Sequence, residues 1–290
     1  MPQSMDQLAN LPGRVAVVTG GAGGLGQAAS LALAEAGVSV AVCDRDEAAL
    51  DRLRADLERI GHPFLLEKLD VRDSDALAVF FQNVIARFEK IHILVNVPGG
   101  SFRAPFLETS AKGVGTVIRQ NFTYVVESIQ HSVPQMPPGS SIINVTSVEG
   151  HRAVPMMSIY GAMKAAVAQL DETLAVEFGP LGIRVNAIAP DHFPTEATIA
   201  SGVHVADESA PEIRLQNSIH IPLQRTGTTD DFAKSILFLA SDLSSYLTGT
   251  TMMLTGGTTA LSGWMRWPSG YTTRTPRPVL NYMVENNTKW

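Results

Sequence analysis

The sequence predicts an α/β fold, a single-domain doubly wound parallel sheet of about seven strands with helices on both faces. Two observations predict it. Short runs rich in β-branched residues alternate with helical patterns along the chain, which is typical of repeated βαβ units. The first of these runs, Arg14 to Thr19, is apolar through its centre rather than alternating with polar residues, as expected of a strand covered on both faces.

The elements follow one another from the N-terminus. Glycines mark the ends of the first two helices, at Gly37 and Gly61, and the second helix carries leucines at helical spacing. Gly113 and Gly115 weaken the start of the fourth helix. The expected strands cover residues 14–19, 38–43, 64–69, 91–95, 141–145, 183–188 and 251–254. The expected helices cover residues 24–36, 46–60, 74–88, 109–130, 158–178 and 230–240.

Two segments interrupt this rhythm. No Pro-, Gly- or Ser-rich linker divides residues 11–257, so we expect one domain there. Within it, residues 190–227 are long and irregular for a connection, which indicates a lid or substrate loop. Residues 258–290 form a C-terminal extension with aromatic residues among prolines, and such residues need a surface to bury against. The aromatic residues are Trp264, Trp267, Tyr271, Tyr282 and Trp290.

Composition excludes several classes of protein. The 290 residues are 45% hydrophobic and 17% charged, enough for a sizeable core. A net charge of −6 argues against nucleic-acid binding. The C-terminal extension carries +3, which leaves −9 for the rest. The polar N-terminus lacks a signal core, and Leu31 to Cys43 is too short to span a bilayer, so we expect a soluble, cytoplasmic protein without membrane contact.

Neither cysteine nor histidine forms a metal-binding pattern. Cys43 is the only cysteine, which rules out an intramolecular disulfide and a thiolate cluster. It lies in an apolar run and is expected to be a buried hydrophobe. The seven histidines lack the spacing of metal ligands, so no metal is predicted.

A glycine-rich turn follows the first expected strand and opens the first helix, in Thr19 to Gly26. Glycines there let the backbone approach a pyrophosphate, whose charge the free N–H groups of the helix attract. Asp44 lies 18 residues after Gly26, where a carboxylate can bind a ribose 2′-hydroxyl and repel a 2′-phosphate. Arg45 could accommodate such a phosphate, and Asp44 or Asp46 could instead cap the next helix. The pattern predicts a Rossmann-like fold that prefers NAD to NADP.

Tyr160 and Lys164 lie one turn apart on one face of an expected helix. Lowering the pKa of a tyrosine from about 10 to about 7 requires roughly 4 kcal/mol. A neighbouring ammonium and an oxidised nicotinamide both contribute to it. The phenolate can then take a proton from an alcohol. A surface Tyr/Lys pair is the alternative. With the glycine turn, the pair predicts a nicotinamide-dependent alcohol/ketone enzyme.

The chain resembles the short-chain dehydrogenase/reductase family over about residues 11–257, with seven motifs in the family's order. They are Thr19-Gly20-x-x-x-Gly24-x-Gly26, Asp70-Val71, Asn96-x-x-Gly99, Asn121, Ser147, Tyr160-x-x-x-Lys164 and Arg184-Val185-Asn186-x-x-x-Pro190.

The resemblance implies a role for each matching residue. Tyr160 would be the acid/base, Ser147 would donate to the substrate oxygen, Lys164 would also bind the nicotinamide ribose, and Asn121 would help to hold a water. Asp70 would reach the adenine amino group. The expected catalytic residues are Asn121, Ser147, Tyr160 and Lys164. The expected cofactor-binding residues are Gly20, Gly24, Leu25, Gly26, Asp44, Arg45, Asp70, Val71, Asn96, Gly99, Tyr160, Lys164, Pro190, Phe193 and Thr195.

The chain departs from the family's pattern at three places. The family commonly has Asn-Asn-Ala-Gly where this chain has Val97 and Pro98 in the middle, so we expect altered loop geometry beside the substrate. Asp191 replaces a glycine after Pro190, and its charge could reach the pocket. Thr255 replaces an aspartate and is expected to affect structure more than chemistry.

The first hypothesis is an NAD-dependent dehydrogenase of a secondary alcohol, with a bulky apolar or cyclic substrate suggested by apolar lid residues. These are Phe193, Ile199, Val203, Ile213, Leu215, Ile219 and Ile221. An NADPH-type carbonyl or 3-oxoacyl reductase and a non-catalytic NAD-binding regulatory protein are the alternatives. The resemblance also implies a homotetramer or homodimer that packs through the long helices, and the aromatic extension could cross to a neighbouring subunit.

Overall fold

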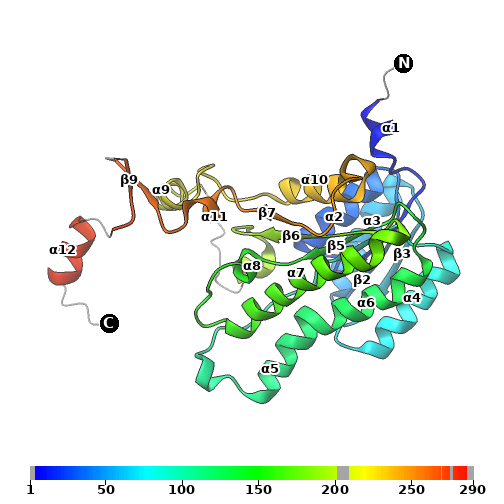
Figure 1. Cartoon of the computed structure of the whole chain (residues 1–290), viewed down its shortest axis with the longest axis horizontal. Coiled ribbons are helices and arrows are strands. Elements are labelled where there is room, and N and C mark those ends of the chain that lie inside the picture. The colour runs from blue at the N-terminus through cyan, green and yellow to red at the C-terminus, as the bar shows by residue number, and fades with distance from the viewer. Residues whose placement is uncertain (1–3, 201–208, 269, 275–276, 286–290) are drawn as a thin grey trace.

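A seven-stranded parallel sheet forms the centre of the computed structural model, which describes residues 4–200, 209–268, 270–274 and 277–285 (Figure 1). Its strand order is β3-β2-β1-β4-β5-β6-β7, which confirms the predicted doubly wound sheet. The strands are β1 Val15–Thr19, β2 Ser39–Asp44, β3 Phe64–Lys68, β4 Ile93–Asn96, β5 Ser141–Val145, β6 Arg184–Pro190 and β7 Thr251–Leu254.

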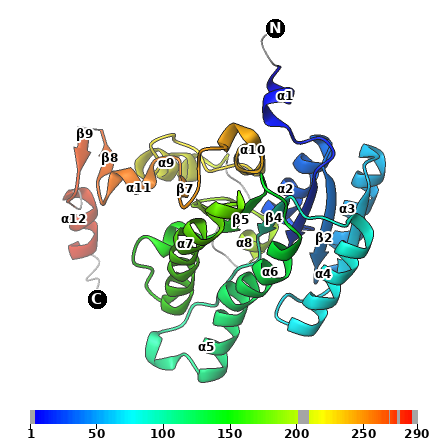
Figure 2. The same cartoon turned by 45° about the vertical axis from the view of Figure 1, so that its right-hand side comes forward.

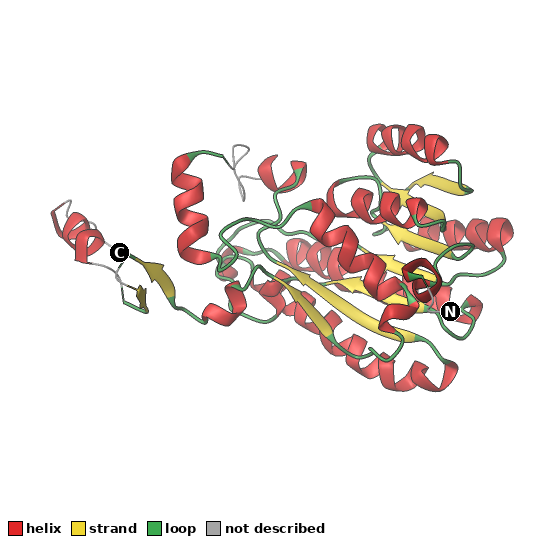
Figure 3. Ribbon diagram, turned by 90° about the horizontal axis from the view of Figure 1, so that it is seen from above, coloured by secondary structure: helices red, strands yellow, loops and turns green. Residues whose placement is uncertain are grey.

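Helices cover both faces of this sheet, as Figures 2 and 3 show. One face packs against α2 (Gly24–Glu35), α3 (Glu47–Ile60) and α10 (Thr229–Ala240). The other packs against α4 (Ser74–Phe88), α6 (Tyr124–Ser132) and α7 (Ser158–Phe178), and α5 (Ala111–Ile118) lies against α7. Alternate strand residues enter the two cores. Val18 lies in the first core and Val17 in the second, which explains the continuous apolar runs.

Local sequence explains several helix ends. The side chain of Asp46 caps α3 by accepting a hydrogen bond from the N–H of Ala49, and Gly61 ends the helix with φ 86°. Thr228 and Asp231 form a reciprocal capping box at the start of α10. The predicted helix over residues 158–178 and the predicted strand over residues 251–254 have the observed bounds.

The long helix expected over residues 109–130 is interrupted. A π-helical turn, Arg119–Thr123, separates α5 from α6. The side chain of Asn121 lies within this turn and donates to the carbonyl of Val117, which competes with the regular backbone pattern. The prediction of one continuous helix was therefore wrong at Asn121.

The segment expected to be an irregular lid contains two helices, α8 (Glu196–Ala200) and α9 (Pro211–His220). Of its predicted apolar residues, Phe193 and Ile221 are buried in the body of the protein. The ring of Phe193 packs edge-on against Phe232, with 6.4 Å between centroids. Phe193 is thus a packing residue of the core rather than part of a lid surface, and Val203 lies outside the described residues.

The C-terminal extension projects away from the sheet (Figures 1 and 3). It comprises α11 (Thr258–Leu261), an antiparallel hairpin of β8 (Met265–Trp267) and β9 (Gly270–Thr272), and α12 (Arg277–Glu285). Trp264, Tyr271 and Tyr282 are 51%, 66% and 65% exposed, so this chain alone does not bury them. A short helix, α1 (Met5–Ala9), lies at the other end. Among the described residues, none of the helices has the length and apolarity needed to cross a bilayer.

Candidate active site

Four strands end at one edge of the sheet and carry most of the predicted site residues. Thr19 of β1 pairs with Asn96 of β4, and Asn96 pairs with Asn144 of β5. Ser147 follows β5 and Asp191 follows β6. Since parallel strands share their direction, the loops after them meet at this edge, beside the reversal of strand order between β1 and β4.

The glycine turn leaves room for a ligand close to the backbone. Gly20 and Gly24 have φ of 62° and 52°, which other residues rarely adopt. A Cβ at Gly26 would lie 2.0 Å from the carbonyl oxygen of Gly20, so the helix packs directly on the turn. Gly23 precedes α2 without a side-chain cap, which leaves the first N–H groups of the helix to an anion. Leu25 lies in that first turn.

Thr195 and Pro98 border this turn. A Cβ at Gly24 would lie 3.3 Å from the Cβ of Thr195, which places the segment after β6 over the glycines. A Cβ at Gly20 would lie 2.6 Å from the Cγ of Pro98, so the proline ring covers Gly20. The carbonyl of Pro98 accepts a hydrogen bond from the Tyr124 hydroxyl at 2.7 Å. These contacts fix the loop that carries the departure at Val97 and Pro98.

Asp44 holds the turn rather than capping a helix. Its carboxylate accepts hydrogen bonds from the N–H groups of Ala22 and Asp46, both at 3.1 Å. Asp46 itself caps α3, so the capping alternative for Asp44 was wrong. Arg45 is exposed beside it. Free N–H groups, positive-φ glycines and a carboxylate at the end of β2 together fit a dinucleotide, with Asp44 on its ribose side.

Asp70 is engaged within the chain. Its carboxylate receives two hydrogen bonds from the Nε of Arg72, at 2.9 and 3.0 Å, and one from Nη2. The guanidinium of Arg72 therefore lowers the pKa of Asp70, and the charge of Arg45 acts in the same direction. An adenine amino group would share this carboxylate with Arg72. Val71 is buried beside it.

Asn96 belongs to a buried polar chain across the sheet. Its side chain accepts from the Thr19 hydroxyl at 3.1 Å and donates to Asn144 Oδ1 at 2.8 Å. Asn144 donates in turn to Asp171 Oδ1 on α7, at 2.5 Å. Burial raises the pKa of Asp171 to about 8, and the hydrogen bond from Asn144 opposes this rise. Sequence reasoning missed Asn144 and Asp171, although a polar residue within the apolar β5 was a signal.

Lys164 lies at the centre of the predicted catalytic group. It is 2% exposed and its Nζ donates to the carbonyl of Val145 at 2.7 Å. Nζ lies 5.8 Å from the ring centroid of Tyr160, so the structure brings the predicted pair together. A Cβ at Gly99 would lie 2.8 Å from this Nζ and 3.2 Å from Asn121 Oδ1, which explains a glycine there. Burial lowers the pKa of Lys164 to about 8.

The phenol of Tyr160 is not acidified by the chain alone. Burial raises its pKa, a hydrogen bond with Ser147 lowers it, and the charge of Glu149 raises it further. The lowering of this pKa that was expected from Lys164 is not observed, and desolvation by burial is the largest effect. A cationic nicotinamide is the further charge that could favour the phenolate. Ser147 itself is buried and accepts from the N–H of Glu149 at 3.2 Å.

Asn121 fixes the loop after β4 from the π-helical turn. Its Oδ1 accepts from the N–H of Gly100 at 3.1 Å, and its Nδ2 donates to the carbonyl of Gly100 at 2.9 Å. The same loop places Gly99 against Lys164. Asn121 thus connects the loop to the catalytic group through its side chain.

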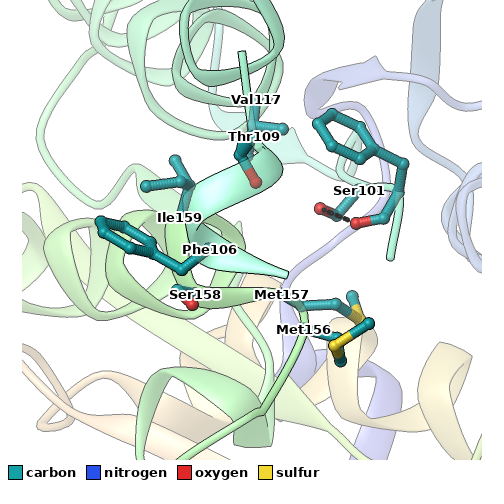
Figure 4. A pocket seen from close by; sticks show the side chains of 9 residues that line it. Ser101, Phe106, Thr109, Val117, Met156, Met157, Ser158 and Ile159 are labelled. Carbon is teal, nitrogen blue, oxygen red and sulfur yellow. Dashed lines mark hydrogen bonds between the residues drawn. The ribbon is translucent and has the colours of Figure 1, made fainter. Parts of the chain in front are cut away.

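A small groove lined by both apolar and hydroxyl side chains lies at the start of α7, next to the turn that carries Tyr160 (Figure 4). Its walls come from the loop after β4, from α5 and from the segment that enters α7. Phe102, Phe106 and Met156 are 44%, 63% and 42% exposed, so the groove presents apolar surface. The full lining is Ser101, Phe102, Phe106, Thr109, Val117, Met156, Met157, Ser158 and Ile159. Sequence reasoning looked for apolar residues after β6 and missed this set.

Asp191 does not present a free charge to the site. Its side chain is 7% exposed, and its carboxylate pairs with Arg152 at 3.1 Å and accepts from the Thr258 hydroxyl at 2.6 Å. Pro190, the last residue of β6, precedes it. Thr255 lies 3.2 Å from Thr259, hydroxyl to hydroxyl.

Cys43 is buried in β2, as predicted, and burial raises the pKa of its thiol. It therefore behaves as a small hydrophobe, without a reactive thiolate.

Comparison with known proteins agrees with this geometry. Residues 20–259 match the family model described as enoyl-(acyl carrier protein) reductase. The chain is 35% identical over 251 residues to cis-4-hydroxycyclohexanecarboxylate dehydrogenase of Sinomonas cyclohexanicum, covering 86% of this chain and 97% of the relative. It is 34% identical over 250 residues to a 3-oxoacyl-[acyl-carrier-protein] reductase of Thermotoga maritima, covering 85% and 98%.

A solved structure shares the fold. A dehydrogenase/reductase from Sinorhizobium meliloti 1021 aligns with a TM-score of 0.79 at 27% identity, over 88% of this chain and 99% of that one. Together with the matching family model and the two relatives, this establishes that the chain belongs to the short-chain dehydrogenase/reductase family.

Proposed function

We propose that this oxidoreductase uses NAD to interconvert a secondary alcohol and a ketone. The observation that carries the proposal is the grouping of Tyr160, Lys164 and Ser147 at the sheet edge that also carries the glycine turn. When bound, NAD supplies a hydride acceptor for the carbinol carbon. Tyr160 takes the hydroxyl proton, and Ser147 holds the substrate oxygen by a hydrogen bond.

Lys164, which is buried, supports this proton transfer. Its ammonium is held by the carbonyl of Val145 and lies near the face of the Tyr160 ring. A positive charge there favours the phenolate over the phenol. Asn121 holds the loop on the other side of the ammonium, and the backbone of the π-helical turn offers a place for a water that relays the proton outward.

The substrate we propose is a bulky apolar or cyclic alcohol. The groove of phenylalanine and methionine side chains beside Tyr160 supports this class. The relative that acts on a hydroxycyclohexanecarboxylate supports it as well. A 3-oxoacyl reductase working with NADPH is the second candidate, favoured by the Thermotoga maritima relative.

A substrate panel distinguishes these candidates. NAD and NADP are titrated separately, and turnover is then assayed with cyclohexanol, cis-4-hydroxycyclohexanecarboxylate and a 3-oxoacyl thioester. Oxidation of a cyclic alcohol with NAD supports the proposal. Reduction of the thioester with NADPH alone favours the second candidate. NAD binding without turnover of any compound would make the chain a cofactor-binding regulatory protein.

Replacing Asp44 with alanine is expected to raise the affinity for NADP relative to NAD. The carboxylate that binds the ribose diol and repels a 2′-phosphate is then absent. Both affinities should also fall somewhat, because Asp44 accepts the hydrogen bond of Ala22 in the glycine turn. Equilibrium titration with each cofactor measures the ratio. An unchanged ratio would assign Asp44 to the turn alone.

Replacing Glu149 with glutamine is expected to shift the pH profile of kcat/KM for alcohol oxidation to lower pH. The profile rises as Tyr160 loses its proton, and the charge of Glu149 raises the pKa of Tyr160. Removing that charge lowers this pKa, so the phenolate forms at lower pH. Asp230→Asn, on the exposed surface of α10, is the matched control. A shift to higher pH in Glu149→Gln contradicts the expectation.

We further propose a homotetramer or homodimer in which the C-terminal extension crosses to a neighbouring copy. Its exposed aromatic side chains need a surface, and its charge of +3 complements the −9 of the rest of the chain. Deletion of residues 262–290 is expected to reduce the assembly size or to raise KM, as measured by sedimentation and steady-state kinetics. Unchanged mass and unchanged KM would remove the extension from both roles.

A further inference from the structure

A guanidinium joins two carboxylates next to the catalytic group. The Nε of Arg152 donates to Glu149 at 3.4 Å, and Nη2 donates to Glu149 at 2.9 Å and to Asp191 at 3.1 Å. Nη1 donates to Asp191 at 3.2 Å. A guanidinium has five N–H donors, so the two carboxylates occupy four of them. Arg152 is therefore committed to the protein rather than open to an anionic substrate.

Glu149 stands between two catalytic side chains. Its N–H donates to the Ser147 hydroxyl at 3.2 Å. Its carbonyl oxygen would lie 2.8 Å from a Cβ at Gly161, the residue after Tyr160. The backbone of Glu149 thus touches both the residue that holds the substrate oxygen and the helix that carries the acid/base.

Asp191 is held in place by a backbone hydrogen bond and by the burial of its side chain. Its N–H donates to the carbonyl of Leu254 on β7 at 3.1 Å, and its side chain is 7% exposed. The hydroxyl of Thr258, the first residue of α11, donates to Asp191 Oδ2 at 2.6 Å. Arg152 donates to the same oxygen from the other side. The Asp191 carboxylate therefore accepts hydrogen bonds both from the catalytic segment, residues 147–160, and from the base of the C-terminal extension.

We propose that Asp191 is a positioning residue that holds the catalytic segment through Arg152 and couples that segment to the C-terminal extension through Thr258. The catalytic half of this inference rests on the proposed function, because it concerns the placement of Ser147 and Tyr160 for proton transfer. The coupling itself does not depend on the substrate.

Hydrogen exchange of the full-length protein tests the coupling without an activity assay. Asp191→Gly removes both contacts of this carboxylate, the one with Arg152 and the one with Thr258, so amide exchange should rise at least about fivefold both in residues 148–157 and in residues 258–261. Arg152→Gln removes only the first contact and should affect only residues 148–157. Thr258→Val removes only the second contact and should affect only residues 258–261. Asp230→Asn, which removes an exposed carboxylate from a helix surface, should affect neither segment.

Kinetics test the positioning role. Asp191→Gly and Arg152→Gln should each lower kcat about tenfold through misplacement of the catalytic side chains, with NAD affinity within about twofold. The double variant should be no slower than the slower single variant, because each single variant already breaks the contact between Arg152 and Asp191. Asp191→Glu, which keeps the carboxylate, should recover part of kcat. A merely structural role would lower the melting temperature without this pattern in kcat.

The two readouts separate the possible failures. If exchange in residues 148–157 is unchanged in Asp191→Gly, or in Arg152→Gln should the former not fold, the proposal is overturned. If both segments respond but kcat does not change, the positioning role is overturned. If no alcohol is oxidised by the wild-type chain, the proposed function fails, and exchange still decides the coupling.

Discussion

Tyr160→Phe is expected to lower turnover at least about a hundredfold, because it removes the group that accepts the alcohol proton. NAD binding should remain within about twofold, since the ring and its packing beside Lys164 are preserved. The loss of turnover should appear in kcat, because the proton is transferred in the transition state. Steady-state kinetics with the wild-type substrate and equilibrium NAD titration measure the two quantities.

Tyr246→Phe provides the matched control, because Tyr246 is fully exposed and far from any predicted role in chemistry. It should leave both quantities unchanged. Near-normal turnover in Tyr160→Phe would remove the phenol from the mechanism and leave only a binding role for this pocket.

Asp171→Asn is expected to stabilise the protein at neutral and alkaline pH, by up to the order of 4 kcal/mol at pH 7. The folded-state pKa of Asp171 is raised to about 8, above the 3.8 of an exposed aspartate. Between these values the unfolded chain releases a proton that the folded chain retains, so stability falls as pH rises from about 4 to about 8. Asparagine has no such titration, and it can still accept the hydrogen bond of Asn144.

Denaturant unfolding at pH 4.5 and pH 8, at equal protein concentration, measures this difference. The gap between variant and wild type should widen toward pH 8 and close toward pH 4.5. Asp51→Asn on the exposed face of α3 controls for the change in net charge. Parallel profiles for Asp171→Asn and wild type would mean that Asp171 is ionised in the folded protein.

The sequence predicts the sheet and its helices well, because burial on both faces gives a strand a simple apolar pattern. The centres of β1, β2 and β4 are runs of apolar residues, and β5 departs from this pattern only at Ser141 and Asn144, so their positions need no knowledge of distant contacts. The pair Tyr160 and Lys164 could also be predicted from the sequence, because a spacing of four residues in a helix fixes its geometry. Local sequence patterns are thus sufficient to predict the fold and the central pair of the candidate site.

What the sequence does not predict depends on contacts between distant segments. Arg152 and Asp191 are 39 residues apart, and no local pattern pairs them. The groove is formed by Phe102 and Phe106 from one loop and by Met156 from another, and only the fold brings these loops together. The burial of Phe193 also depends on a distant contact, because an apolar residue in a loop fits a lid and a core equally well until its neighbour Phe232 is known.

The π-helical turn at Arg119–Thr123 has a consequence for engineering the chain length. Such a turn accommodates one residue more than an α-helix would, so every residue after it is rotated by about 100° relative to those before it. Asn121 lies within this turn and reaches the loop after β4 through Gly100. A deletion of one residue here would restore a regular helix and remove the backbone geometry that directs Asn121 at Gly100, so the loop would lose this contact.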